Sequence, residues 1–451
     1  MQSHSPRASP GPAKWHNWAG NVTATARRSA APATADQVAA EVRRAAEDGL
    51  TIRMTGSGHS FTPVAATSGV LLRPGRLTAV RSIDNAAGTV TVEAGCPLHV
   101  LNAELLARGL SLANMGDIQV QTVSGATQTG THGTGRDVGG MAAQVAGLEL
   151  VLADGSIVTC SADAPGGGLT VPGADGLFDA ARVGLGALGI VTAVTFRVVP
   201  AFLLQAREEP MTWSRVISEL DELTADNEHF EFYWFPHSEG CLTKRNNRTD
   251  GPARPLPRWR YLLDDEFLSN SLFGATNRLG RRVPAAIPTI NSIAARALGA
   301  RTYTDAAYRV FTSPRRVRFK EEEYAVPRQA LSDVLGEVKA LFSRRDWRIS
   351  FPIEVRVTPA DDVWLSTAYR RDSAYIAIHV FHPSPHEEYF ADVESIMTAV
   401  GGRPHWGKMH TRDADYLAGV YPRHSDFVAL RDALDPERRF ANEYLTQVLG
   451  S

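Results

Sequence analysis

The sequence predicts an α+β fold of two domains, and three observations support this prediction. The chain has 451 residues, which at roughly 150 residues per domain is enough for two or three domains. Segments with helical periodicity and segments with strand-like alternation both occur. After Pro200 glycine becomes rarer, and aromatic and charged residues become more frequent. We therefore place a domain boundary near residue 200.

The composition excludes several protein classes. With 43% apolar and 21% charged residues, the chain is neither disordered nor collagen-like nor a coiled coil. Its 47 Lys and Arg against 49 Asp and Glu lack the basic excess that binding to nucleic acid needs, so we expect no nucleic-acid partner. The three cysteines, Cys96, Cys160 and Cys241, are odd in number and lack metal-site spacing. They favour a reducing compartment, and we expect a cytoplasmic protein.

The first domain is predicted to span residues 16–200, after a disordered tail at 1–15. The tail has no apolar export segment. Apolar residues at helical spacing predict a helix over 34–47, and a second helix over 98–108 ends at Gly109. Short β-prone segments predict strands at 50–54, 70–72 and 90–93.

The remainder of this domain combines loops and antiparallel strands. Residues 116–135 are so rich in glycine and β-branched residues that we expect a loop without a helix. Alternating apolar and polar residues predict antiparallel strands over 146–158 and 190–199. The most apolar stretch, 183–194, has only 12 residues and contains three glycines. It is too short to span a membrane.

The second domain is predicted to span residues 201–402. Its strand-like segments are 230–235, 348–358 and 375–381, with a long helical stretch between them. Residues 244–260 are expected to be an irregular basic loop. A C-terminal segment, 403–451, is expected to return to the first domain and to end in a strand or a helix.

Residues 53–61, RMTGSGHSF, combine a strand exit, a Gly-Ser-Gly turn and a histidine. Such a turn tolerates positive φ and exposes consecutive backbone N–H groups, so it can form a nest for an anion. The motif lacks the third glycine of the dinucleotide fingerprint. An ordinary tight loop therefore remains the alternative.

A second loop raises the expectation of a large anionic ligand. Ser124, Gly125 and residues 130–135, GTHGTG, offer further N–H and hydroxyl donors with little side-chain bulk. Two such loops in one domain indicate a diphosphate. The glycine-rich segment 184–192 either brings backbone close to an extended cofactor or forms a tightly packed strand entry.

The second domain contains candidate catalytic side chains. In FPIEVRV, Glu354 and Arg356 are two positions apart in a strand, so they project to the same side. They either line a cavity or form a solvated ion pair. His379 is either a proton acceptor or a hydrogen-bonded strand histidine. His379, His405 and His410 do not have the spacing of a metal motif, and we expect no metal.

Six motifs in chain order resemble those of the aldonolactone oxidoreductases in the vanillyl-alcohol oxidase superfamily of flavoproteins. They are TGSGHSFTP (55–63), TVSGATQTGTHGTG (122–135), VGLGALGIVTAVTF (183–196), FPIEVRVTPADD (351–362), GRPHWGKMH (402–410) and LDPERRFANEYLTQVLG (434–450). The resemblance implies that the first domain binds FAD and consists of two small α+β subdomains. It implies that the second domain is a cap that carries the substrate pocket on a mainly antiparallel sheet with helices.

The resemblance also implies roles for particular residues. His59 would bind the flavin 8α-methyl group covalently, and Lys408 would lie near N1 and the C2 carbonyl of the flavin. Glu354, Arg356, Lys408 and His379 would form the catalytic set. The cofactor set would be Thr55, Gly56, Ser57, Gly58, His59, Ser60, Phe61, Asp117, Ser124, Gly125, Thr131, His132, Gly133, Thr134, Gly189, Ile190 and Lys408.

The implied activity is FAD-dependent oxidation of a secondary alcohol in a sugar lactone or polyol. With L-gulono-1,4-lactone the product would be a 2-keto lactone that tautomerises to ascorbate. Either Glu354 or His379 would take the hydroxyl proton. Oxygen, a redox protein or a quinone would reoxidise the flavin. The alternatives are a tailoring oxidase or alditol oxidase with another hydroxylated substrate, and a flavin-binding module without turnover.

Overall fold

The computed structural model describes residues 11–451. Residues 1–10 of the predicted tail lie outside the described residues. The prediction of a disordered tail is wrong for its last residues, because Ala13–His16 forms strand β1. This strand pairs with β2 (Thr23–Ala26) in an antiparallel ribbon. The buried ring of Trp15 packs there against Val22 and Leu71 and holds the strand in place.

The first domain begins with a small parallel sheet in the order β3-β5-β4. Its strands are β3 (Arg28–Ala30), β4 (Ile52–Met54) and β5 (Val70–Leu72). Helix α1 (Ala35–Glu47) covers it, as the periodicity of 34–47 predicts. Thr34 begins the helix by accepting a hydrogen bond from the Gln37 N–H.

The second subdomain is an antiparallel sheet in the order β10-β9-β11-β7-β6. Its strands are β6 (Val80–Asp84), β7 (Thr89–Glu93), β9 (Val145–Val151), β10 (Ile157–Ser161) and β11 (Ile190–Arg197). Helices α2 (Leu98–Leu106), α3 (Val123–Gln128) and α4 (Leu177–Ala181) pack beside it. A short ribbon, β8 (Leu110–Ser111) with β12 (Val199–Pro200), leads out of the domain.

Helix α3 contradicts the prediction that residues 116–135 contain no helix. Thr122 caps the helix, since its hydroxyl accepts a hydrogen bond from the Gly125 N–H at 3.2 Å. Val123 and Ala126 are fully buried in the domain core. Capping and burial therefore stabilise a helical turn that glycine and threonine alone would disfavour.

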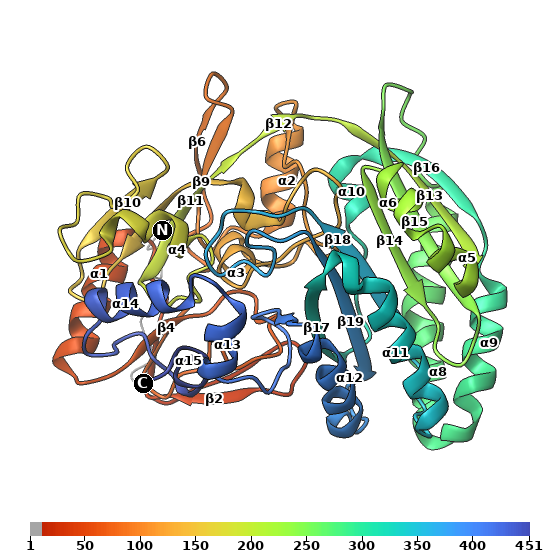
Figure 1. Cartoon of the computed structure of the whole chain (residues 1–451). Coiled ribbons are helices and arrows are strands. Elements are labelled where there is room, and N and C mark those ends of the chain that lie inside the picture. The colour runs from red at the N-terminus through yellow and green to blue at the C-terminus, as the bar shows by residue number, and fades with distance from the viewer. Residues whose placement is uncertain (1–10) are drawn as a thin grey trace.

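The second domain is built on one eight-stranded sheet, entirely antiparallel, in the order β16-β13-β15-β14-β18-β19-β17-β20 (Figure 1). Its strands are β13 (Leu203–Thr212), β14 (His229–Trp234), β15 (Gly240–Thr249), β16 (Arg301–Ala306), β17 (Phe319–Pro327), β18 (Ile353–Thr358), β19 (Ser373–Phe381) and β20 (Arg403–Pro404). The predicted irregular loop at 244–260 is wrong over 244–249, which belongs to β15. Within this strand Thr243 and Asn246 are buried, and Lys244 and Arg245 between them are partly exposed.

Helices cover one face of this sheet. They are α5 (Trp213–Ser218), α6 (Leu220–Ala225), α11 (Leu331–Arg344) and α12 (Glu387–Ala399). A helical segment lies at the outer end of the domain and comprises α7 (Arg258–Tyr261), the π-helix η3 (Leu262–Leu272), α8 (Phe273–Arg282) and α9 (Ile287–Ala297). Short helix α10 (Ala307–Phe311) follows β16. The opposite face of the sheet is directed toward the first domain (Figure 1).

The chain then crosses back to the first domain. Helices α13 (Ala414–Val420), α14 (His424–Leu434) and α15 (Glu443–Leu449) pack into the first-domain core. In Figure 1 these dark-blue helices lie beside α4 and β4. The final element, which the sequence left open, is thus a helix. None of the helices in residues 11–451 combines the length and apolar character that crossing a membrane requires.

Candidate active site

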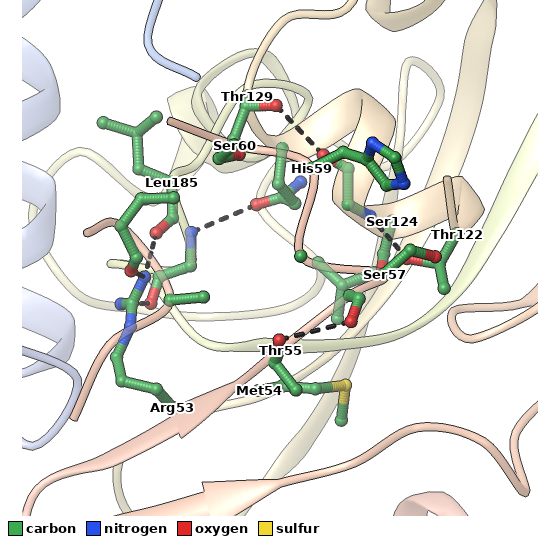
Figure 2. A pocket seen from close by; sticks show the side chains of 18 of the residues that line it. Arg53, Met54, Thr55, Ser57, His59, Ser60, Thr122, Ser124, Thr129 and Leu185 are labelled. Carbon is green, nitrogen blue, oxygen red and sulfur yellow. Dashed lines mark hydrogen bonds between the residues drawn. The ribbon is translucent and has the colours of Figure 1, made fainter. Parts of the chain in front are cut away.

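A groove in the first domain contains about 830 Å³ of empty space, part of it open to solvent. It runs between the loop after β4, helix α3 and the segment before β11 (Figure 2). Ten residues of the predicted cofactor set line it: Thr55, Gly56, Ser57, Gly58, His59, Ser60, Ser124, Gly125, Gly189 and Ile190.

The loop after β4 fits an anionic ligand. Within the described part of the chain, none of the backbone N–H groups of residues 56–60 donates a hydrogen bond to another protein group. Gly58 has a φ of +74°, and a Cβ on Gly56 would lie 2.7 Å from the Thr122 hydroxyl oxygen. Exposed N–H groups beside a helix N-terminus are a common diphosphate site. The groove therefore suits the pyrophosphate of a dinucleotide.

A buried arginine, Arg53, joins the walls of this groove. Its Nη1 donates to the Gly186 and Phe440 carbonyl oxygens at 2.8 Å each. Its Nη2 donates to the carbonyl oxygens of Val64 at 2.5 Å and Leu185 at 2.6 Å, the latter visible in Figure 2. Burial lowers the pKa of Arg53 to about 10, so it remains a cation. This role was not predicted from the sequence. The signal for it was the position of Arg53 between the apolar residues Ile52 and Met54 of a strand.

Thr134 from the second glycine loop connects the two domains, whereas the neighbouring Gly133 packs inside the first domain. The Thr134 hydroxyl donates to the Phe230 carbonyl oxygen at 2.5 Å. A Cβ on Gly133 would lie 2.3 Å from the Met115 carbonyl oxygen. Thr131 accepts a hydrogen bond from the Gln121 amide at 3.2 Å. The groove described above is lined by none of these three predicted cofactor residues.

The segment that contains Lys408 lies directly against the histidine loop. The Phe61 N–H donates to the Gly407 carbonyl oxygen at 2.7 Å, and Lys408 Nζ is 5.3 Å from the centre of the Phe61 ring. Burial, with the nearby Lys408 charge, lowers the pKa of His59 to about 4. His59, which stacks on Trp18 at 5.3 Å, is therefore a neutral imidazole at physiological pH.

Glu354 and Arg356 are buried on the sheet face that points to the first domain. Tyr233 on β14 donates a 2.6 Å hydrogen bond to Glu354 Oε1, and Arg356 pairs with the same oxygen. Arg356 Nε donates to Glu231 at 2.8 Å, and Lys244 pairs with Glu231 at 2.8 Å. Burial raises the pKa of Glu354. The solvated alternative is excluded, since both side chains are less than 10% exposed.

Asp117 connects this network to the cofactor side. Its carboxylate pairs with Arg315 at 2.7 Å and lies 3.7 Å from Arg356 Nη2. Burial opposes its charge, but Arg315, Arg356 and Lys408 together hold the pKa of Asp117 well below its usual range. A series of charged groups thus runs from the Glu354–Arg356 pair through Asp117 toward Lys408.

Two glutamates on β17, Glu321 and Glu323, were missed by the sequence reasoning. Lys408 Nζ lies 2.5 Å from Glu321 Oε2. His379 Nε2 lies 3.4 Å from Glu321, and His132 Nε2 lies 3.3 Å from Glu323. The sequence signal was the position of Glu321 and Glu323 in FKEEEYAVP. They are two residues apart, so in a strand both side chains project to the same side.

Both of these histidines have their two ring nitrogens engaged. His379 Nδ1 lies 3.2 Å from the Pro352 carbonyl oxygen, and His132 Nδ1 lies 2.9 Å from the Gly133 carbonyl oxygen. A carbonyl oxygen only accepts, so each Nδ1 must donate. Each Nε2 then faces a carboxylate. This arrangement favours a hydrogen-bonded strand histidine at 379 over a free proton acceptor.

His132, Glu323 and His405 come together in a cluster whose candidate ligand atoms lie within 4.8 Å of one another. Their hydrogen bonds explain the cluster without an ion. His405 Nδ1 accepts from the Gly407 N–H at 3.0 Å, which places the ring proton on Nε2. Burial lowers the pKa of His405 to about 3 and keeps the ring neutral. In this tautomer Nε2 carries the ring proton and presents no lone pair to the cluster.

Three histidines, of which His405 is fully buried and His59 and His410 are partly buried, predict loss of stability in acid. Burial lowers the pKa of His59 and His410 to about 4 and of His405 to about 3, against 6.5 in the unfolded chain. Near pH 5, unfolding would therefore take up about three protons at these groups. Their contribution to stability is complete above pH 6.5 and is lost as the pH falls. We expect Tm to drop between about pH 7 and pH 5, with a smaller drop in His410→Gln. A Tm independent of pH would contradict this.

Comparisons with known proteins agree with the geometry. Residues 26–161 match a family described as FAD binding domain, and residues 194–448 match one described as D-arabinono-1,4-lactone oxidase. The chain is 40% identical to L-gulono-1,4-lactone dehydrogenase of Mycobacterium tuberculosis (strain CDC 1551 / Oshkosh), over 97% of this chain and 99% of that protein. It is 32% identical to L-gulonolactone oxidase of Bos taurus and to alditol oxidase of a Streptomyces species, each over 96% of this chain and 98% of the relative.

A solved structure shares the fold. Cholesterol oxidase from B. sterolicum superimposes with a TM-score of 0.82 at 18% sequence identity, over 99% of each chain. The α+β architecture of an FAD-binding domain and a cap domain is thereby confirmed, as is FAD as the cofactor. The resemblance carried by the six motifs is confirmed as well. The chain is an FAD-dependent oxidoreductase that acts on CH–OH groups, and it belongs to the D-arabinono-1,4-lactone oxidase family.

Proposed function

We propose that this enzyme oxidises the secondary alcohol next to the carbonyl of a sugar lactone, with L-gulono-1,4-lactone as the model substrate. The observation that carries the proposal is the buried Glu354–Arg356 pair, joined through Asp117 to the Lys408 side of the cofactor groove. The names of the relatives, L-gulono-1,4-lactone dehydrogenase and L-gulonolactone oxidase, support the substrate class. When bound, FAD accepts the hydride from the carbinol carbon.

Glu354 is the group we assign to remove the hydroxyl proton. Burial raises the pKa of this carboxylate and so makes it a stronger base. Tyr233 and Arg356 both bind Oε1, so Oε2 is the oxygen left for the substrate. His379 is the weaker candidate, because a carbonyl oxygen and Glu321 engage its two nitrogens.

Two cations supply the electrostatic part of the reaction. Arg356 lies beside Glu354 and can hold a substrate oxygen that gains negative charge as its proton leaves. Lys408 lies next to the histidine loop, where its charge favours reduction of the cofactor. Burial opposes the Lys408 charge, but Glu321 and Glu323 raise its pKa and keep it protonated. The 2-keto lactone formed would tautomerise to an ascorbate-type enediol.

The 32% identity to an alditol oxidase favours a linear polyol as the second candidate substrate. An anaerobic titration separates the two, since loss of flavin colour reports hydride transfer directly. We expect L-gulono-1,4-lactone to bleach the enzyme at much lower concentration than D-sorbitol does. The reverse order would make the enzyme an alditol oxidase, and no bleaching by either would leave a tailoring oxidase or a flavin-binding module. The same sample identifies the electron acceptor. Reoxidation of the reduced flavin in air would identify oxygen, and reoxidation only after a quinone or redox protein is added would identify that compound.

A covalent bond from His59 to the flavin 8α-methyl group is part of the proposal. The neutral imidazole of His59 lines the groove and has a nucleophilic lone pair. The bond would replace one hydrogen of that methyl group, which would leave as a proton, and the external electron acceptor would take up the two electrons released. We expect acid-precipitated wild-type protein to stay yellow and His59→Ala to release its FAD into the supernatant. A colourless wild-type pellet would contradict the bond, and His16→Ala serves as the control.

The cysteines support a cytoplasmic location as part of this proposal. Cys96, Cys160 and Cys241 are free and buried. Burial raises the pKa of the Cys96 thiol to about 11 and of the other two to about 12. Thiols that stay protonated are unreactive, and none of the three forms a disulfide.

A further inference from the structure

The helical segment 258–297 exposes an unusual apolar surface. Thirteen large apolar side chains are exposed among the described residues, and ten of them lie between 259 and 293. The core of this surface is formed by Trp259, Leu263, Phe267, Leu268 and Leu272, which are 42–67% exposed. In a soluble monomer such side chains are normally scattered singly. The concentration of exposed apolar side chains in one segment indicates a surface that binds an apolar partner.

Helix geometry puts these side chains on one side of the segment. A π-helix has about 4.4 residues per turn, as follows from its i→i+5 hydrogen bonds. Leu263, Phe267, Leu268 and Leu272 in η3 therefore lie along one stripe. The inner side is packed, since Asn270 donates to the Pro314 carbonyl oxygen and the Phe273 ring contacts the Phe351 ring at 4.8 Å. The exposed stripe is thus the face left without a partner.

Exposed apolar side chains also occur in the next two helices. In α8 and just beyond it, Leu279 and Val283 are spaced four residues apart and are 50% and 48% exposed. In α9, Ile293 is 60% exposed. Both helices lie along the outer edge of the second domain, away from the FAD-binding domain (Figure 1). The segment is therefore on the side of the second domain that faces away from the FAD-binding domain.

The charge exposed by the segment is basic. Arg258, Arg278, Arg281, Arg282 and Arg296 are all exposed, and none has an ion-pair partner in the part of the chain that the structure describes.

The acidic residues of the segment are already neutralised. Asp264 pairs with Arg260 at 3.3 Å, Asp265 with Arg301 at 3.2 Å, and Glu266 with Arg316 at 2.8 Å. The segment therefore exposes both apolar side chains and guanidinium groups that have no ion-pair partner among the described residues, although the whole chain carries a net charge of -2.

We propose that segment 258–297 docks the enzyme on an anionic lipid membrane surface. Acyl chains would cover the apolar stripe, and lipid phosphates would pair with the arginines. Trp and Tyr beside Arg are typical of helices that lie in the plane of the membrane interface. A second copy of this chain fits less well, because twofold contact would place the five arginines against themselves. This docking is independent of the substrate, and it anchors the enzyme without spanning the bilayer.

Vesicle flotation of the FAD-loaded enzyme tests the proposal. Vesicles of one part phosphatidylglycerol to two parts phosphatidylcholine should carry the enzyme, whereas vesicles of phosphatidylcholine alone should carry much less. Arg281→Gln with Arg282→Gln should weaken binding about thirtyfold, and high salt should act in the same direction. Trp259→Ser with Leu263→Ser should weaken it about tenfold or more. All variants should keep their flavin and their turnover with a soluble dye acceptor.

Matched controls are available elsewhere on the surface. Ile157→Ser removes an exposed apolar side chain from β10, and Arg76→Gln removes an exposed arginine from the first domain. Both should bind vesicles like the wild type. Absence of wild-type binding, or equal loss in the controls, would overturn the proposal. So would a wild-type dimer in sedimentation analysis that Trp259→Ser with Leu263→Ser converts to monomer while vesicle binding is absent.

Discussion

Glu354→Gln should slow anaerobic flavin reduction by about a thousandfold, the middle of the range for loss of a general base, while FAD content stays unchanged. Glutamine keeps the shape and can accept the Tyr233 hydrogen bond, but an amide cannot take a proton at neutral pH. The measurement is stopped-flow loss of flavin absorbance with L-gulono-1,4-lactone. In the wild type the same rate should fall as the pH drops, because burial raises the pKa of Glu354 and the base must be deprotonated.

A matched control separates chemistry from charge loss. Glu208→Gln removes one buried carboxylate from the same sheet, where Glu208 pairs with Arg301 at 2.7 Å. It should lower stability and leave the reduction rate near the wild-type value. If Glu354→Gln lost FAD and rate in equal measure, the side chain would be structural. If the flavin of Glu354→Gln were reduced at the wild-type rate, another group would accept the hydroxyl proton, and His379 would become the candidate base.

Local sequence patterns were sufficient for the parts of the site that depend on nearby residues. The Gly-Ser-Gly turn at 56–58 predicted the anion nest, because its conformation depends on glycine alone. The two-residue period of a strand predicted that Glu354 and Arg356 share a side. Their burial was not predictable from that pattern, since it depends on β14 placing Tyr233 opposite Glu354 and Glu231 opposite Arg356.

The missed residues depend on contacts between distant segments. Glu321 is directly opposite His379 because of the register between β17 and β19, which the sequence does not show. Three consecutive glutamates look like a solvated strand, and only tertiary packing turns Glu321 and Glu323 toward Lys408 and His132. Lys244 was taken for part of a loop for the same reason, since pairing with both β13 and β14 makes β15 a central strand.

Arg53→Met should lower the free energy of unfolding by about 3 kcal/mol or more, because buried carbonyl oxygens lose their donor and each unsatisfied buried group costs about 1–3 kcal/mol. Arg53 is only 4% exposed. Methionine fills much of the volume but donates no hydrogen bond. The carbonyl oxygens of Val64, Leu185, Gly186 and Phe440 would lose a charge-assisted donor at once. The groove should therefore open, because these carbonyls belong to three chain segments far apart in sequence.

Thermal unfolding and flavin content of Arg53→Met measure the two effects together. We expect a markedly lower Tm and substoichiometric FAD in the purified protein. Arg53→Lys should be intermediate, since an ammonium has three donors for the four carbonyls. Arg73→Met is the control, because Arg73 is exposed next to β5 and donates to Ser29 Oγ at 3.3 Å. If Arg53→Met matched that control in both Tm and FAD content, Arg53 would not be what holds the groove walls together, and the carbonyls would have to be satisfied by water.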